Sequence, residues 1–386
     1  MEQVRFAVVG IGRMGGTHAY QLLRGRVKGA CLAAVCDISD EALLKFACRH
    51  KATGIPAFKS YKEMLDGAGF DAVIIAVPHY FHIEIARFFI ENGKYVLIEK
   101  PIGVTVGEAY AFNDFLKDYE GKAAVMYNQR TNPVYRKAKT ILDKKALGKI
   151  VRASFIITDW YRSDAYYESN AWRASFAGEG GGVLINQCVH QLDVLQWLIG
   201  LPESIEAHIF TKGRRITAEN EVTALLKYTD DVYCTLSASG RELWGANRIE
   251  IAGDRGRLVI GKNVMKHISW KYSEPEVNAS TTQGYGYAPK RVRYYFYGLR
   301  LIPDLISGQQ IRIVKNFTAH IKKGEKLISP AEEGVNALSI INGIYLSAWE
   351  NKAVKLPLDG AIYEKALKEK IREESEIKND VRKNTD

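Results

Sequence analysis

One glycine-rich turn and two titratable side chains carry most of the chemistry that this sequence suggests. The turn matches the pattern G-x-G-x-x-G and consists of Gly10, Ile11, Gly12, Arg13, Met14 and Gly15. It follows an apolar run of strand length and opens an amphipathic segment of helix length. In that context the first glycine permits a tight turn, the second admits a pyrophosphate close to the backbone, and the third allows close helix packing. We therefore predict a dinucleotide-binding site, with an accidental glycine turn as the alternative.

A carboxylate follows the second apolar run of the chain. Asp37 comes roughly twenty residues after the third glycine, where a carboxylate accepts hydrogen bonds from the adenosine ribose. A negative charge at this point would repel a 2′-phosphate, so the sequence favours NAD over NADP. The alternative is that Asp37 only caps the next helix, a role that Ser39 or Asp40 can fill equally well.

Lys100 and His190 are the candidate catalytic residues. Lys100 stands at the carboxyl end of a predicted strand, where an ammonium group can stabilise alkoxide character on a reacting oxygen. The alternative is a surface ion pair with Glu99. His190 lies four residues after Asn186, on the same face of a predicted helix. A histidine suits proton removal from a hydroxyl near neutral pH, although a structural role is the alternative.

The elements that must position these residues alternate along the first part of the chain. This alternation predicts a parallel, doubly wound sheet covered by helices, which is a Rossmann domain at residues 1–127. The predicted strands are Val4 to Val9, Cys31 to Cys36, Ala72 to Val77, Tyr95 to Ile98 and Ala123 to Tyr127. The predicted helices are Gly15 to about Arg24, Asp40 to about His50, His82 to Asn92 and Gly107 to about Lys117.

The sequence after residue 127 predicts an α+β domain over residues 128–363. Short alternating runs indicate a large, mostly antiparallel open sheet. Helices are expected after Pro133, over Gly182 to about Leu198, over Ile311 to Lys322 and over Glu332 to Trp349. The stretch from Glu274 to Tyr297 is expected to be a long loop or hairpin. Residues 364–386 mix both charge signs, so we expect a solvated helix or tail that frays into disorder.

Composition and charge argue against several classes of partner. The 386 residues carry a formal net charge of +10, but the basic residues are scattered among acidic ones, so no nucleic-acid partner is expected. No apolar run is long enough to span a bilayer or resembles a signal peptide, which predicts a cytoplasmic protein without membrane contact. The five cysteines lack metal-ligand spacing, so we expect free thiols and no metal. A sheet face without helical cover predicts homo-oligomerisation through the second domain.

Several motifs together resemble the Gfo/Idh/MocA family of oxidoreductases, named for glucose-fructose oxidoreductase and inositol dehydrogenase. Beside the glycine-rich turn, they are Ala76-Val77-Pro78, His82, Gly93 to Val96, Glu99-Lys100-Pro101 and the segment from Gly180 to Asp193. The resemblance covers nearly the whole chain. It implies an NAD-binding Rossmann domain followed by a domain that binds a sugar-like substrate.

The resemblance also implies roles for single residues. Cofactor contacts are expected from the glycine-rich turn and from Asp37, Ala76, Pro78, His82, Glu99, Lys100, Asn128, Trp172 and Arg173. Substrate contacts are expected from Lys100, Arg130, Tyr161, Asn186 and His190, of which Lys100 and His190 are catalytic. The alternative for Trp172 and Arg173 is a buried aromatic with a snorkelling arginine. Tyr161, Tyr166, Tyr167, Tyr285 and Tyr287 could stack on sugar faces, although packing is expected for most of them.

One position departs from the family pattern D-x-x-x-H, because Asn186 stands where an aspartate is frequent. An amide can hold a substrate hydroxyl or orient His190, but it lacks the charge that would stabilise an imidazolium. Either Lys100 then takes more of the proton transfer, or a tyrosine such as Tyr161 assists. The string Asn-Gln-x-x-His resembles the branch whose dehydrogenases act at the 3-hydroxyl of sugars, nucleotide sugars and glycosides.

These inferences predict reversible, NAD-dependent oxidation of a secondary ring hydroxyl, at C3 in that branch, on a sugar, cyclitol or glycoside. Two alternatives stay open. The first is an enzyme that oxidises and re-reduces its substrate without net turnover of NAD. The second is a regulator that senses NAD and needs no residues for proton transfer.

Overall fold

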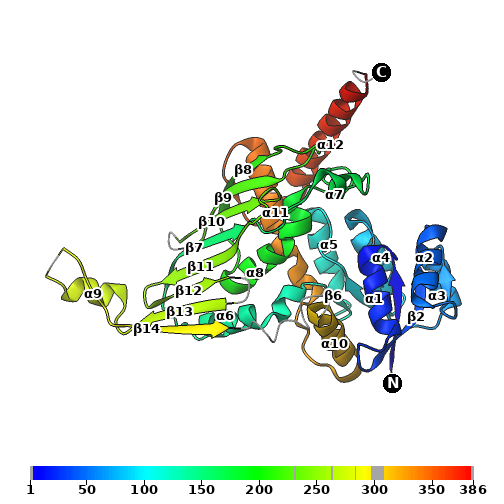
Figure 1. Cartoon of the computed structure of the whole chain (residues 1–386), viewed down its shortest axis with the longest axis horizontal. Helices are drawn as coiled ribbons and strands as arrows, with labels where there is room; N and C mark the ends of the chain where they lie inside the picture. The colour runs from blue at the N-terminus through cyan, green and yellow to red at the C-terminus, as the bar shows by residue number, and fades with distance from the viewer. Residues whose placement is uncertain (1–2, 230–231, 262–263, 283, 297–307, 384–386) are drawn as a thin grey trace. The chain divides into compact units, whose positions relative to one another are not determined.

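The computed structural model describes residues 3–229, 232–261, 264–282, 284–296 and 308–383, which divide into two compact units (Figure 1). The first unit comprises Met1–Thr131 and Ser307–Leu338, and the second comprises Asn132–Ile306 and Ser339–Asp386. This division differs from the predicted one in two respects. Residues 307–338 return to the first unit, and the charged C-terminal segment belongs to the second.

The first unit contains a six-stranded parallel sheet with the strand order β3-β2-β1-β4-β5-β6. Its strands are β1 Val4–Val9, β2 Ala30–Cys36, β3 Ala57–Phe58, β4 Ala72–Ile75, β5 Tyr95–Ile98 and β6 Ala123–Val125. Its helices are α1 Arg13–Leu23, α2 Asp40–His50, α3 Tyr61–Gly67, α4 His82–Glu91, α5 Val106–Leu116 and α10 Gly308–Lys323. The predicted doubly wound Rossmann sheet is confirmed. The strand order reverses between β1 and β4, the point at which such sheets bind their ligands.

Helix α10 belongs to the apolar core of the first unit, although the sequence suggested that it lies in the second domain. Its buried residues Ile313, Val314 and Phe317 join a core cluster that includes Phe6 of β1. The ring centroids of Phe6 and Phe317 are 6.4 Å apart. The amphipathic pattern identifies the face of α10 that is buried, but it cannot identify the sheet that covers this face.

The second unit contains a nine-stranded sheet with the order β14-β13-β12-β11-β7-β10-β9-β8-β15. Its strands are β7 Ile150–Ile157, β8 Ser204–Phe210, β9 Glu221–Lys227, β10 Tyr233–Ser239, β11 Asn247–Gly253, β12 Gly256–Ile260, β13 Val264–Trp270, β14 Lys290–Phe296 and β15 Val354–Lys355. Its helices are α6 Pro133–Asp143, α7 Asp164–Glu168, α8 Val189–Ile199, α9 Glu274–Ser280 and α12 Gly360–Lys383, while α11 Gly334–Glu350 crosses the division between the units. Among these strands only β7 and β10 pair in parallel, so the predicted mostly antiparallel sheet is confirmed.

Two segments of the second unit differ from their predicted structure. The stretch predicted as a loop or hairpin from Glu274 forms α9 and the edge strand β14, with α9 beyond that edge of the sheet in Figure 1. A capping box of Ser273 and Glu276 starts α9, and this S-x-x-E pattern is a local signal for a helix start. The helix predicted from Gly182 instead contains a π-helical turn over Leu184–Cys188 before α8 begins.

The exposed face of the second sheet carries apolar side chains on neighbouring strands. Leu225 of β9 and Tyr233 of β10 are each 38% exposed. The self-association expected at this face stays a prediction. Within the described ranges, no helix is both long enough and apolar enough to cross a membrane.

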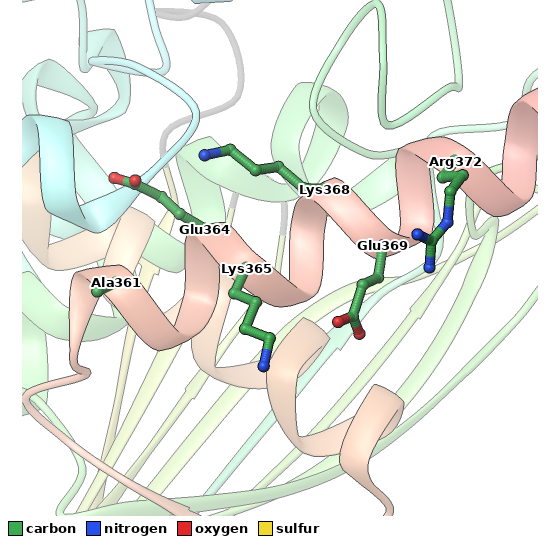
Figure 2. A pocket seen from close by; sticks show the side chains of 6 residues that line it. All are labelled: Ala361, Glu364, Lys365, Lys368, Glu369 and Arg372. Atoms are coloured by element: carbon green, nitrogen blue, oxygen red, sulfur yellow. The ribbon is translucent and has the colours of Figure 1, made fainter.

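The C-terminal helix α12 has a solvated face and a buried face. A depression of about 380 Å³ is lined by residues of α12 alone: Ala361, Glu364, Lys365, Lys368, Glu369 and Arg372. Figure 2 shows their side chains along the helix. Acidic and basic groups alternate there, as is typical of a solvated helix face. On the other face, Glu374 is only 4% exposed and accepts hydrogen bonds from the backbone N–H groups of Phe176 (2.8 Å) and Ala177 (3.0 Å). The segment expected to be a solvated tail therefore anchors a loop of the second unit.

The place of α10 in the first core can be tested with F317A. We expect this substitution to lower the free energy of unfolding by about 3–5 kcal/mol, because it leaves a cavity beside Phe6. Denaturant unfolding of the intact chain would measure the loss. F296A serves as the control, since Phe296 is 76% exposed. Equal stability of the two variants would contradict the packing described above.

Candidate active site

The glycine-rich turn joins β1 to α1 through two close backbone approaches and one open position. A Cβ added at Gly10, whose φ is +85°, would lie 2.4 Å from the carbonyl oxygen of Ala76, and one at Gly15 would lie 1.7 Å from the Gly10 oxygen. A Cβ at Gly12 would meet no atom within 4 Å. The first and third glycines are thus required by the fold itself, whereas the second leaves space where a ligand can approach the backbone.

The N-terminus of α1 is suited to an anion. Its N-cap is Gly12, no side chain caps it, and its first turn contains no acidic residue. The N–H groups at a helix start lack partners within the helix and carry partial positive charge. The turn and the helix start therefore fit the pyrophosphate of a dinucleotide.

Asp37 lies at the end of β2 and holds the glycine-rich turn. Its carboxylate accepts hydrogen bonds from the N–H of Ile11 at 2.7 Å and of Ser39 at 2.9 Å. The N-cap of α2 is Ser39, whose hydroxyl accepts from the N–H of Ala42. The alternative role of Asp37 as that cap is therefore filled by Ser39, and Asp37 is placed beside the turn as the cofactor prediction requires.

His82 ties together the segments that follow β4 and β5. Its ring is buried, with Nδ1 2.7 Å from the carbonyl oxygen of Pro101 and Nε2 2.9 Å from that of Val77. Both contacts are hydrogen bonds only in the doubly protonated ring. Burial lowers the pKa of His82, whereas the two carbonyl groups and Glu99 act in the opposite direction. This burial argues against the predicted direct contact with a cofactor and for a role in positioning the strand ends near Ala76, Pro78 and Lys100.

Glu99 connects the segment that carries Lys100 to α1. Its buried carboxylate lies 2.7 Å from Nε2 of His18 and accepts a hydrogen bond from the backbone N–H of Lys100 at 3.2 Å. Lys100 itself is partly exposed just beyond β5. Because all strands of this sheet are parallel, Lys100 lies at the same edge as the glycine-rich turn. This edge brings together the residues expected to serve the cofactor and the reacting oxygen.

Asn128 and Arg130, which follow β6, have different surroundings. Oδ1 of Asn128 is buried without a hydrogen-bond partner among the described residues. Arg130 is 1% exposed, and its guanidinium pairs with Glu333 and donates to the carbonyl oxygen of Ile328 at 3.3 Å. The burial of its guanidinium and these contacts within the first unit give Arg130 a structural role and argue against the predicted contact with substrate.

In the second unit, Glu219 organises the glycine run before the π-helical turn. Its carboxylate is 1% exposed and accepts hydrogen bonds from the N–H of Gly182 and of Leu184, each at 2.9 Å, and from the hydroxyl of Tyr345 at 2.9 Å. Burial raises the pKa of Glu219 to about 7 even though these donors favour its charged form. The π-helical turn that this carboxylate anchors contains Asn186. His190 follows in the first turn of α8.

Tyr166 of α7 is the centre of a polar cluster that includes Asn186. Its hydroxyl oxygen lies 2.8 Å from Nη1 of Arg173, 3.0 Å from Nε2 of Gln187 and 3.4 Å from Nδ2 of Asn186. The guanidinium of Arg173 also lies over the rings of Tyr166 and Trp172, at 4.5 and 4.8 Å from their centroids. Trp172 is only partly buried. The predicted pair of Trp172 and Arg173 thus belongs to the same cluster as Asn186.

Tyr161, which the sequence suggested as an aid to proton transfer, is not in this cluster. Tyr161 is 38% exposed, with Arg214 5.3 Å from its ring centroid. Tyr166, one of the tyrosines for which stacking or packing was expected, holds the more central position. Glu179 was also missed, although it directly precedes the glycine run; it is 2% exposed and accepts a hydrogen bond from Asn186.

Metal ligands and disulfide bonds are absent from the part of the chain that the structure describes. No group of three histidine, cysteine or acidic side chains there could hold a metal ion. The five cysteines are free thiols, and burial raises the pKa of Cys36 to about 12. Burial therefore keeps the Cys36 thiol protonated near neutral pH.

Comparisons with known proteins agree with the arrangement in each unit. Residues 4–127 match the profile of an oxidoreductase family with an NAD-binding Rossmann fold, and residues 135–259 match the Gfo/Idh/MocA C-terminal domain. The scyllo-inositol 2-dehydrogenase (NAD(+)) of Bacillus subtilis is 27% identical over 69% of this chain and 76% of its own length. The levoglucosan dehydrogenase of Pseudarthrobacter phenanthrenivorans is 26% identical over 92% of this chain and 99% of its own. The WlbA dehydrogenase from Bordetella pertussis, solved with NADH and UDP-GlcNAcA, has a TM-score of 0.75 at 23% identity over 92% of this chain and 100% of its own.

The different surroundings of the three glycines predict different effects of G12A and G15A. We expect G15A to lower the free energy of unfolding by about 1–3 kcal/mol, because its Cβ would collide with the Gly10 carbonyl. G12A should leave stability within about 0.5 kcal/mol but weaken NAD binding by roughly tenfold or more, because its methyl group fills the space for the pyrophosphate. Calorimetric titration with NAD and thermal unfolding would measure both effects. The control is G54A, which also adds a methyl group in open space; equal NAD affinity of G12A and G54A would contradict the assignment.

The buried carboxylate of Glu219 predicts a pH dependence of stability. Its pKa rises from the ordinary 4.5 to about 7 on folding, so between these values the folded chain holds a proton that the unfolded chain has lost. The free energy of unfolding should therefore fall as pH rises from about 4.5 to about 7, by on the order of 3 kcal/mol, and then level off. Denaturant unfolding at pH 5 and pH 8 would show a smaller pH effect for E219Q than for the wild type. E206Q, on the exposed face of β8, should retain the full effect; an unchanged pH effect in E219Q would refute the prediction.

Proposed function

The chain belongs to the Gfo/Idh/MocA family of oxidoreductases, and on that premise we propose that it reversibly oxidises a secondary ring hydroxyl of a sugar, cyclitol or glycoside. NAD, for which the Rossmann unit of this family is built, accepts the hydride when it is bound. The observation that carries the proposal is the position of Lys100, just beyond β5 at the sheet edge that also holds the glycine-rich turn. Related proteins named as inositol and levoglucosan dehydrogenases support the class of substrate.

The residues of the first unit bind and orient in this proposal. The glycine-rich turn and the N-terminus of α1 receive the pyrophosphate, and Asp37 receives the ribose hydroxyls and excludes a 2′-phosphate. Ala76, Pro78 and Asn128 line the same edge of the sheet. Lys100 donates a hydrogen bond to the hydroxyl oxygen of the substrate and stabilises the negative charge that develops on it.

The second unit handles the proton and orients the sugar. His190 takes the hydroxyl proton during oxidation and returns it during reduction. Asn186, on the preceding π-helical turn, holds a substrate hydroxyl, and Trp172 with Arg173 borders the site. The Asn-Gln-x-x-His string supports carbon 3 as the carbon that is oxidised.

We expect K100A to lose about 10²–10³-fold in kcat on the preferred substrate while retaining NAD affinity, because one donor to a developing oxyanion is removed. The assay is NADH absorbance over monosaccharides, cyclitols, anhydrosugars, nucleotide sugars including uronates, and aryl glycosides. The control variant is K117A, since the Lys117 side chain is 76% exposed and pairs with Asp114 on the surface.

The outcomes separate the three functions considered. Substrate-dependent NADH formation that requires Lys100 supports the dehydrogenase. NAD that stays bound through purification, with substrate conversion but no net reduction, favours oxidation and re-reduction within one cycle. Bound NAD with no conversion of any substrate, in wild type and K100A alike, favours a regulator.

A further inference from the structure

Glu179 is a buried carboxylate at the start of the glycine run. Its Oε2 accepts a hydrogen bond from the N–H of Ala174 at 2.7 Å, and its Oε1 accepts one from the side-chain amide of Asn186. Ala174 has a φ of +46°, which is uncommon for a residue with a Cβ. The carboxylate therefore joins an unusual backbone turn to the residue that replaces the family's aspartate.

The pairing determines which way the Asn186 amide faces. The NH₂ group of Asn186, and not its oxygen, donates to Oε1 of Glu179, while Oε2 accepts from the N–H of Ala174. The same NH₂ group lies 3.4 Å from the hydroxyl oxygen of Tyr166. Its two hydrogens are thus directed at Glu179 and Tyr166, and Oδ1 is the atom that Asn186 directs elsewhere.

Tyr166 is itself held in place as an acceptor. Arg173 and Gln187 donate to its hydroxyl oxygen at 2.8 and 3.0 Å, in addition to Asn186. A phenolic oxygen has two lone pairs, which Arg173 and Gln187 can fill, so the 3.4 Å contact with Asn186 is the weakest of the three. The orientation of Asn186 therefore depends chiefly on Glu179.

We infer that Glu179 is a positioning residue that fixes Asn186 as a hydrogen-bond acceptor for a hydroxyl of the substrate. An aspartate combines an acceptor oxygen and a negative charge in one side chain. Here Asn186 presents the oxygen, and the buried carboxyl group of Glu179 lies behind it. This inference rests on the proposed function, because it assigns the acceptor to a substrate hydroxyl.

A reciprocal exchange of the two side chains tests the inference. In E179Q the orienting carboxylate is lost and Asn186 can turn its NH₂ group toward the substrate, so we expect kcat/KM to fall by about tenfold. In N186D two carboxylates face each other, and their repulsion should lower kcat/KM by at least as much at neutral pH. In E179Q/N186D the amide of residue 179 donates to the new carboxylate, which again presents an acceptor, so we expect recovery to within about threefold of the wild type.

The control is E168Q, which makes the same chemical change at an exposed glutamate paired with Arg215. Thermal unfolding of every variant shows whether it is folded at the assay temperature. A role in stability alone predicts that kcat/KM of the folded E179Q protein equals that of the wild type. That result, or a double variant no better than the product of the single effects, overturns the inference.

A failure of the proposed function would be distinguishable. If the wild type converts no substrate in the panel, the proposed function fails, and with it the assignment of the acceptor to a substrate hydroxyl. The pairing of Glu179 with Asn186 is then tested by a double-mutant cycle in which the free energy of unfolding of E179Q, N186D and the double variant is measured. Destabilisation of each single variant with recovery in the double variant supports it, and additive destabilisation overturns it.

Discussion

Backbone N–H groups in irregular buried segments must find acceptors, and in this protein acidic side chains supply many of them. Strands and helices satisfy their own backbone, so the need arises where the chain leaves them to form the candidate site. The pattern recurs in both units, at the following pairs: Asp37 with Ile11, Glu99 with Lys100, Glu179 with Ala174, Glu219 with Gly182 and Leu184, and Glu374 with Phe176 and Ala177. Because a carboxylate accepts hydrogen bonds without donating, each one sets the direction of the N–H groups around it.

This solution has an energetic cost that differs from one carboxylate to the next. Glu99 lies against His18, which can offset its charge, whereas Glu219 is surrounded by neutral donors and has its pKa raised toward neutrality. Removal of a charged group from water is unfavourable unless several good hydrogen bonds replace its hydration. The glycine run therefore combines a well-defined geometry with a marginal electrostatic balance, a combination that is common where structure serves a site.

The sequence was sufficient for features that depend on local patterns. The alternation of apolar runs predicted the parallel sheet, and the spacing of Gly10, Asp37 and Lys100 placed them at strand ends as the structure has them. Contacts between distant segments could not be predicted in this way. Arg130 was expected to meet substrate because nothing near it in the sequence points to Glu333, which lies 203 residues away.

The dependence on contacts between distant segments also explains the other differences between the predicted and the observed structure. The helical pattern from Ile311 was visible, but the pattern does not say which sheet buries it. Glu219 lies 37 residues from the glycine it bonds, and nothing near it in the sequence distinguishes it from Glu221. The π-helical turn before α8 has no local sequence signal either. It changes the angular offset between Asn186 and His190 around the helix axis.

The anchoring of a loop by Glu374 makes the end of the chain relevant to any kinetic work on this protein. Proteases remove residues first from exposed chain ends. Erosion of α12 past Glu374 would release the N–H groups of Phe176 and Ala177, and with them the loop that leads to Glu179. The glycine-rich turn of the other unit would be untouched, so a clipped preparation would still bind dinucleotide while its turnover declined. The intact mass of the chain is therefore as informative about such a sample as its affinity for NAD.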